Sequence, residues 1–405
     1  MIATSPRTPA IKSETDFSPI DNEAPLRWLR SVGLVPRDGL GVVRRALFFA
    51  LLTWLPIAIW AVLTGRLTSA EMGEPLLQHY GVHIRCLLAI PLLILAESAL
   101  HKAALRIVPQ FLSSGLVGPD QRTGFEDAIR AVRRVRDATL PWVLVLGAAI
   151  GWTLTDHPDL RADALSWAID RDGTLGFGGW WVSYVVRPLF IALLLAWLWR
   201  LLVVTYWFWR VGKLGLSLVP THPDRTGGLA FVEKVHGAFA MVTFAVSAVL
   251  ASRWAHEVLH HDVPLQSLRL PAAAFVIIWT MVLLLPLLAL APALLGARAR
   301  AIPAYAALVG EQGRLVYRRW ILREPVGDAP LLDAPEIGPV ADAAAMYDAV
   351  KRMRVVPIGK GSIIQILLPI VLPLVVVALL RVPLKAVTYV AGARKVSRAW
   401  SRKGE

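Results

Sequence analysis

The sequence is poor in charged residues. Asp, Glu, Lys and Arg make up 18% of the 405 residues, whereas a soluble domain carries about 25%. Hydrophobic residues make up 56%, and the mean hydropathy is +0.55. So few charges cannot cover the surface of a water-soluble protein of this length. The composition therefore excludes a soluble fold and favours a membrane protein.

Cysteine and acidic residues are also scarce. The one cysteine, Cys86, lies inside an apolar run, which excludes an intramolecular disulfide framework and a cysteine-based zinc site. The 29 acidic residues are outnumbered by 43 basic ones, giving a net charge of +14. No nucleic-acid-binding motif accompanies this charge, and the basic residues lie between apolar segments. We therefore expect anionic lipid headgroups, and not nucleic acid, as the partner of the basic residues.

Long apolar runs dominate what is present. A helix needs ~20 apolar residues to cross the hydrocarbon core of a bilayer. Seven segments approach this length: 46–64, 85–105, 139–155, 180–209, 236–253, 271–296 and 363–380. Backbone groups in lipid must form hydrogen bonds within their own segment, so these are helices and not strands. The prediction is an all-α integral membrane protein, a bundle of six or seven transmembrane helices with cytoplasmic amphipathic helices.

The loops alternate in positive charge, which sets the orientation. Basic residues concentrate before the first segment and in the second, fourth and sixth loops, whereas the loop 155–179 is acidic. This pattern predicts a cytoplasmic N-terminus in the inner (plasma) membrane. Seven crossings would, however, place the basic tail after residue 380 outside. The last segment is therefore either a seventh span or a re-entrant hairpin, and the prolines within it favour the hairpin slightly.

These features divide the chain into four regions. We expect a cytoplasmic N-terminal region with an interfacial helix, a six-helix transmembrane domain, a cytoplasmic helical loop, and a hydrophobic C-terminal segment with a basic tail. Their bounds are 1–44, 45–296, 297–361 and 362–405. In the second loop, Phe125, Ile129 and Val132 recur at helical spacing beside arginines, which predicts an amphipathic helix on the inner leaflet.

Ionisable residues inside apolar segments are candidates for a functional site, because burying a charge in lipid is expensive. Glu97 and Arg200 lie about two turns from the cytoplasmic ends of the second and fourth segments. Since both are at similar depth, we predict that they form an ion pair. His101 is one turn from Glu97, and His236 begins the fifth segment on the same side. The alternative is that Arg200 snorkels and Glu97 is solvated at a helix end.

A polar loop between the fourth and fifth segments reads Thr-His-Pro-Asp-Arg-Thr-Gly-Gly, from Thr221 to Gly228. Its His222, Asp224 and Arg225 are candidates for ligand binding. The alternative is a tight turn, since Pro fixes φ, Asp favours turns and Gly-Gly permits positive φ.

The sequence His256-Glu257-Val258-Leu259-His260 matches H-E-x-x-H, in which two imidazoles on one helix face hold zinc and the Glu is a general base. Such a site needs a third ligand, and the sixth segment offers no Asp, Glu or His. We therefore expect surface histidines, no metal and no cofactor, and keep His256 and His260 as an alternative metal site.

Four stretches carry a family resemblance: LAIPLLILAE (88–97), FLSSGLV (111–117), LAWLWRLLVVTYWFWRVGKLGLSLVPTHPDRTGGLAF (195–231) and MYDAVKRMRVVPIGKGSIIQ (346–365). On these the chain resembles a family of uncharacterised bacterial multi-pass inner-membrane proteins that carry a T-H-P-D-R-x-G-G-L motif between two transmembrane helices. The resemblance covers roughly residues 44–395. Thr226 stands where the family has Ala, and Ala230 where it has Gly. The resemblance implies a shared membrane fold and a site near the His-Pro-Asp-Arg turn.

The functional expectation follows from the candidate residues. We expect a non-enzymatic membrane protein that binds or transports a small polar or anionic solute, or a lipid headgroup, at a cytoplasmic-side polar cluster. The cluster would contain Glu97, His101, Arg200, His222, Asp224, Arg225 and His236. One alternative is a metal-dependent hydrolase using the outer His256 and His260 or the inner His222 and Asp224. Another is a non-catalytic scaffold subunit of a membrane complex.

Overall fold

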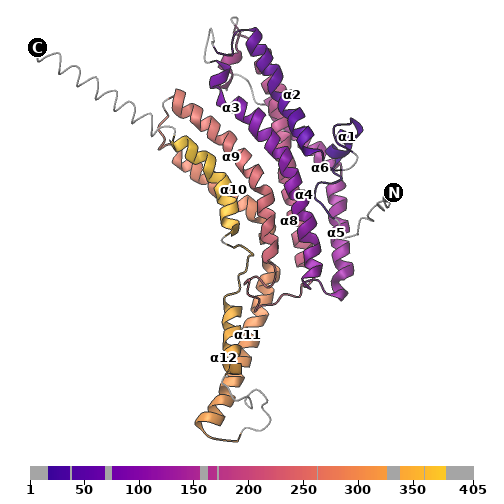
Figure 1. Ribbon diagram of the computed structural model, residues 1–405, viewed down its shortest axis with the longest axis vertical. Helices are drawn as coiled ribbons and strands as arrows, with labels where there is room; N and C mark the ends of the chain where they lie inside the picture. Colours follow the sequence, from indigo (N-terminus) through magenta and orange to yellow (C-terminus); the bar gives the residue numbers. More distant parts are fainter. Residues whose placement is uncertain are drawn as a thin grey trace, which may run out of the picture.

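The computed structural model describes residues 17–36, 39–68, 75–155, 163–170, 173–261, 263–325, 338–359 and 361–379. These residues are overwhelmingly helical, and the β-structure among them is an isolated bridge between Ile169 and Leu175. The predicted all-α fold is confirmed (Figure 1).

Six helices in the described residues are long and apolar enough to cross a bilayer. They are Val42–Leu63 (α2), Tyr80–Ser113 (α3, Tyr80–His83, continued by α4, Ile90–Ser113), Phe177–Gly212 (α7, Phe177–Trp181, continued by α8, Arg187–Gly212), Ala230–His260 (containing α9, Val235–His260), Arg269–Leu288 (α10) and Gly361–Leu379. Their outer surfaces carry exposed apolar side chains, such as Leu51 of α2 and Ile278 of α10. A surface of this kind suits contact with lipid tails. The chain is a multi-pass α-helical membrane protein.

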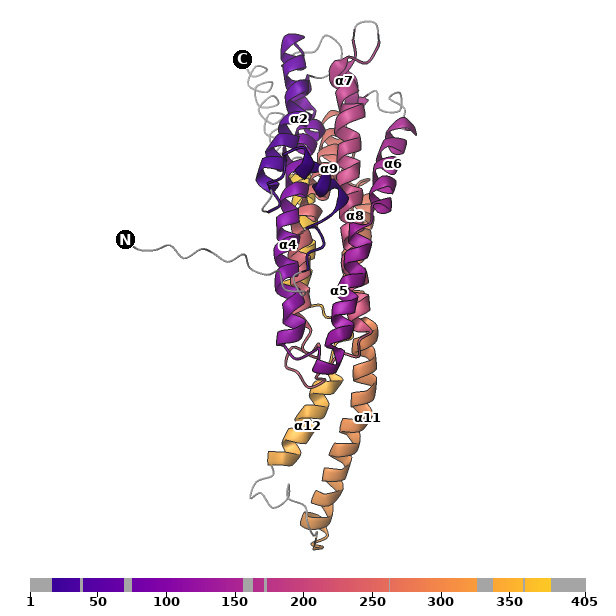
Figure 2. The same cartoon turned by 90° about the vertical axis from the view of Figure 1, so that its right-hand side faces the viewer.

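The third expected segment is a helix, α6 (Leu140–Thr155), but a short one. Its 16 residues extend for about 24 Å, less than the hydrocarbon core of ~30 Å. It packs along α8 in the upper half of the bundle (Figure 2).

The helix before α6 is amphipathic, as predicted. In α5 (Arg122–Asp137), Phe125, Ile129 and Val132 are buried. However, α5 runs alongside α8 and does not lie flat, as a helix on a leaflet surface would (Figures 1 and 2). Helices α4 and α8 extend well beyond their most apolar parts, and these extensions give α5 an apolar face to pack against. Phe111 of α4 joins this core through ring contacts with Phe125 and Trp207.

A helical hairpin projects from one end of the bundle (Figure 1). Helix α11 (Ala291–Val316) continues into a π-helical turn, Tyr317–Ile321, and α12 (Gly338–Lys351) packs back along it. From Ala291 to Ile321 this arm is about 46 Å long.

The last described helix, Gly361–Leu379, is continuous through Pro369 and Pro373. It packs against α9: the Ser247 hydroxyl donates a hydrogen bond to the carbonyl of Ile370, and Val377 belongs to the same buried apolar cluster as Trp254. The predicted course of the chain from residue 380 onward, as a seventh span or as a re-entrant hairpin, lies outside the described residues.

Candidate functional site

Two arginines and two glutamates form a buried ion-pair network inside the bundle. The Glu97 carboxylate of α4 accepts hydrogen bonds from Arg45 of α2 and from Arg200 of α8, the latter at 3.0 Å between Oε1 and Nη2. Arg200 also binds Glu23, with Nε to Oε1 at 3.0 Å and Nη2 to Oε2 at 2.7 Å. All four side chains are at most 5% exposed. The predicted Glu97–Arg200 pair is therefore confirmed.

The network is electrically neutral, which explains how four charges are buried together. An isolated buried charge is very costly, and a pair offsets that cost only with good geometry and additional hydrogen bonds. The contact of Arg200 with Glu23 is bidentate, the strongest form of such a bond. The Arg200 guanidinium also lies 5.1 Å from the ring centre of Trp197 and 6.0 Å from that of Trp142.

The network lies where two helices of the apolar layer begin. Arg45 is in the first turn of α2, and Trp142 is in the first turn of α6. Past these four side chains, toward Ser113 and Gly212, α4 and α8 continue beside α5, which is rich in charged residues. The four charges therefore mark the boundary between the apolar layer of the bundle and its more polar extension.

Sequence reasoning missed Glu23 and Arg45. Arg45 counted only as one of the basic residues that orient the first span, and Glu23 belonged to a region expected to lie outside the bundle. The available signal was the apolar spacing around Glu23, since Phe17, Ile20 and Leu26 are all at most 1% exposed.

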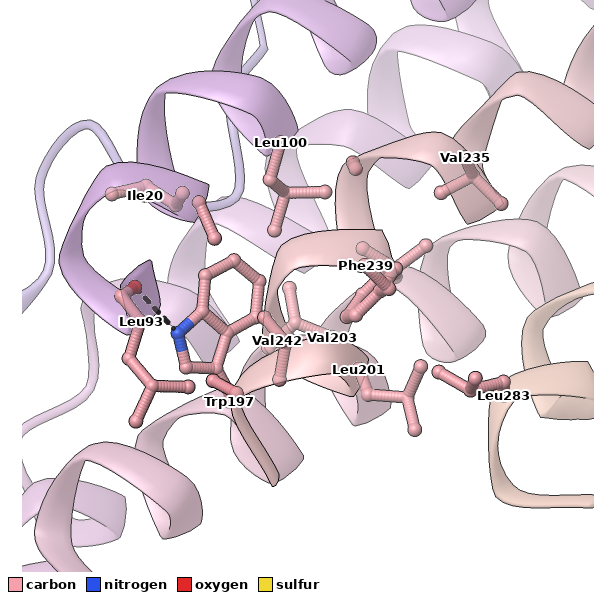
Figure 3. Close-up of a cluster of buried hydrophobic side chains, with 14 of the residues drawn as sticks. Ile20, Leu93, Leu100, Trp197, Leu201, Val203, Val235, Phe239, Val242 and Leu283 are labelled. Atoms are coloured by element: carbon pink, nitrogen blue, oxygen red, sulfur yellow. Dashed lines mark hydrogen bonds between the residues drawn. The ribbon is translucent and has the colours of Figure 1, made fainter. Parts of the chain in front are cut away.

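In the segment 17–23, before the short helix α1 (Ala24–Ser31), residues 17–20 and Glu23 are buried, and their contacts are with α4, α5 and α8. His101 of α4 lies with Nδ1 2.8 Å from the hydroxyl of Ser18, and Arg136 of α5 donates a hydrogen bond to the Ser18 carbonyl. Ile20 joins the apolar cluster around Trp197, whose indole nitrogen donates to the carbonyl of Leu93 at 2.9 Å (Figure 3). His101 thus belongs to the surroundings of the network through this segment.

Burial changes the proton affinity of Glu23. Desolvation raises the pKa of its carboxyl to about 7, against the opposing effect of the Arg200 guanidinium. The nearby charge of Glu97 raises this pKa further.

The His-Pro-Asp-Arg turn lies far from this network. About 16 residues of helix separate Glu97 from the end of α4 at Ser113, which is about 24 Å. Just beyond that end, Gly228 of the turn packs beside Leu116, and the Ser217 amide donates to the Leu116 carbonyl at 2.8 Å. The single polar cluster that the sequence predicts is therefore divided in two, because α4 and α8 extend well beyond the ion-pair network before they reach the turn.

Asp224 organises the turn itself. Its carboxylate accepts backbone hydrogen bonds from Thr226 at 2.8 Å, Gly228 at 3.2 Å and Ala230 at 3.1 Å. Although desolvation alone would raise it, these bonds hold the pKa of Asp224 below its usual value. His222 lies 2.8 Å from the same carboxylate. The side chains of Asp224 and His222 are thus engaged within the turn.

Arg225 adopts a positive φ of 60°, its side chain is exposed, and its carbonyl accepts a hydrogen bond from the Arg354 amide at 2.7 Å. This bond joins two of the stretches that carry the family resemblance. Met353 also packs against Gly227, where a side chain would crowd it. The turn therefore anchors the segment that connects α12 to the last helix.

His236 is buried at the start of α9, 2% exposed, with Nδ1 3.2 Å from the carbonyl of Glu233. Glu233 in turn accepts a hydrogen bond from the Ser362 hydroxyl at 2.7 Å, at the beginning of the last helix. His236 is thus placed at the junction of α9 with the last helix.

The histidines at the opposite end of the bundle lie close together. The His256 ring centre is 4.7 Å from that of His260 and 5.2 Å from that of His79. Glu257, the general base that the H-E-x-x-H pattern would need, is paired with Arg253 at 3.0 Å. Among the described residues, no group of three or more His, Cys, Asp or Glu side chains is arranged to hold a metal ion.

Comparison with known proteins adds no further identification. No protein family, no curated protein and no solved structure matches the chain. The six membrane-spanning helices define its class, and the buried network defines its candidate site.

Proposed function

We propose that this protein resides in a bacterial inner membrane, with its N-terminus in the cytoplasm, and binds a small anion through Arg200. The ligand carries a carboxylate or a phosphate, either as a free solute or as a lipid headgroup. The proposed membrane location agrees with the family that the sequence resembles, whereas the proposed site lies away from the His-Pro-Asp-Arg turn to which that resemblance points.

The supporting observation is the carboxylate already bound to Arg200. Its guanidinium holds Glu23 in a bidentate contact, the geometry with which arginine recognises carboxylates and phosphates. One further Arg200 nitrogen, Nη1, is buried and has no hydrogen-bond partner among the described residues. The indole rings of Trp142 and Trp197 flank the guanidinium. The site thus has both the charge and a spare donor for an anion.

Binding of inorganic phosphate and acetate to purified protein in uncharged nanodiscs tests whether the site binds a free anion. Binding of the protein to phosphatidylglycerol in nanodiscs that contain this lipid tests whether the ligand is a lipid headgroup. Arg200→Lys keeps the charge but loses the planar fork, so binding should fall at least tenfold. Arg225→Ala is the matched control and should bind like the unchanged protein. Equal binding by Arg200→Lys and the unchanged protein contradicts the proposal.

The hairpin of α11 and α12 supports a second candidate, a scaffold subunit of a membrane complex. Its tip exposes Tyr317, Trp320, Ile321 and Leu322, each between 49% and 65%. A photo-crosslinking residue at position 320 should capture a protein partner in intact membranes, whereas one at Arg300, nearer the bundle, should not. Equal crosslinking products from positions 320 and 300 would argue against a scaffold role.

A further inference from the structure

The segment 17–23 occupies the place that a ligand of Arg200 would take. Phe17 is 1% exposed and Ile20 is fully buried, so the segment is inserted into the bundle and not laid over it. It precedes the first membrane-spanning helix. Release of the segment therefore does not require any membrane-spanning helix to leave the bundle.

Polar groups from three helices hold the segment. His101 of α4 contacts the Ser18 hydroxyl, Arg136 of α5 donates to the Ser18 carbonyl, and Arg200 of α8 binds the Glu23 carboxylate. The Arg136 guanidinium also lies 5.8 Å from the ring centre of Phe17. Departure of the segment would therefore expose two arginines and one histidine to the same space.

A small void lies beside the segment. Its volume is about 10 Å³, about that of a single water site, and Phe17 and Pro19 line it together with residues of α4, α8 and the start of α9. It is lined by apolar side chains, including Ala104 and Val204, and so gives the segment no polar contact. The segment is thus held by its charged and polar contacts together with the burial of Phe17 and Ile20 in the hydrophobic core.

The Glu23 carboxylate that binds Arg200 can be exchanged for another anion without leaving a buried charge unpaired. Breaking a buried pair is unfavourable because it leaves an uncompensated charge, yet exchanging one carboxylate for another anion leaves the network neutral. Arg45, which remains paired with Glu97, keeps the second glutamate in place during such an exchange.

We propose that the segment 17–23 is an internal ligand, whose Glu23 carboxylate blocks Arg200 until an external carboxylate or phosphate displaces it. This inference rests on the proposed anion binding at Arg200. Anion binding is then coupled to release of the segment 17–23. The conformation of the chain before the first span therefore depends on whether an external anion occupies the site.

The experiment follows the exposure of position 18. The native Cys86 is fully buried, and replacing it with Ala leaves a cysteine-free chain into which Ser18→Cys is introduced. Labelling by a membrane-impermeant maleimide should be slow without an anion and at least tenfold faster with saturating phosphate or acetate. Ser31→Cys on the exposed end of α1 is the matched control, and its labelling should be independent of the anion.

Glu23→Gln removes the competing charge, so it should label quickly at position 18 without an anion and bind phosphate about tenfold more tightly. Asp21→Asn removes a negative charge two residues away, outside the contacts of Arg200, and should change neither quantity. Protein beginning at Ala24 provides a second variant for the binding measurement, and should match Glu23→Gln.

The outcomes separate the two proposals. If phosphate binds but neither the anion nor Glu23→Gln speeds labelling at position 18, the internal-ligand inference is wrong and anion binding stands. If neither phosphate nor acetate binds to the unchanged protein, to Glu23→Gln or to the shortened chain, both proposals are overturned.

Discussion

At the scale of single residues, Glu97 is the centre of the network. Within the network it is the one carboxylate that contacts both arginines, so its loss removes the carboxylate partner of Arg45 and leaves Arg200 with Glu23 alone. We expect Glu97→Gln to lower the free energy of unfolding by roughly 3 kcal/mol, because a buried cation loses its counter-ion. Chemical unfolding in detergent measures this change.

The control for Glu97→Gln is an exposed pair. Arg253→Ala breaks the contact with Glu257, in which Arg253 is 75% exposed. Exposed pairs contribute roughly 0–1 kcal/mol, so this variant should unfold almost like the unchanged protein. A loss in Glu97→Gln no larger than in Arg253→Ala would mean that the network contributes little to stability.

At the scale of elements, the contact between the 3-10 turn Ala230–Lys234, just before α9, and the last helix depends on a glycine. A β-carbon at Gly359 would lie 2.7 Å from Oε2 of Glu233, the carboxylate that accepts the Ser362 hydroxyl. Gly359→Ala must therefore move Glu233 away from the start of the last helix. We expect a loss of about 1–2 kcal/mol in stability, since a partly buried hydrogen bond is broken.

Gly361→Ala is a matched control two residues away. A β-carbon at Gly361 meets nothing within 4 Å, so this variant should be as stable as the unchanged protein. Thermal unfolding of both variants compares them directly. Equal stability of the two would show that Glu233 does not hold the last helix in place.

At the scale of the whole molecule, the proposed orientation places the hairpin and the N-terminus on the same side. Cysteines replacing Trp320 and Ser31 should be labelled in inverted membrane vesicles and protected in intact cells. A cysteine at His261 should behave in the opposite way. The reverse pattern would overturn the proposed orientation and, with it, the cytoplasmic location of the candidate site.

Ser401→Cys decides the course of the last segment. A seventh span places it on the side of His261, whereas a re-entrant hairpin places it on the side of Trp320. The continuous helix Gly361–Leu379 is long enough for a crossing, so its far end is the point at which the two arrangements diverge.

The fold class could be predicted from the sequence because it depends on local composition. Runs of apolar residues must be helical in lipid, whatever their neighbours are. The Glu97–Arg200 pair was also predictable, because the depth of a residue along a straight helix follows from its position in the sequence. The amphipathic pattern of α5 is local in the same way.

Only the tertiary structure decided what completes the network and what does not. Glu23 reaches Arg200 across about 177 residues of sequence, and no local pattern specifies such a contact. The sequence predicts His222 and Asp224 in one cluster with Glu97 because all three lie toward the cytoplasmic side of the membrane. The long extensions of α4 and α8 place them elsewhere, since each added turn of helix moves the connecting loop another 5.4 Å away.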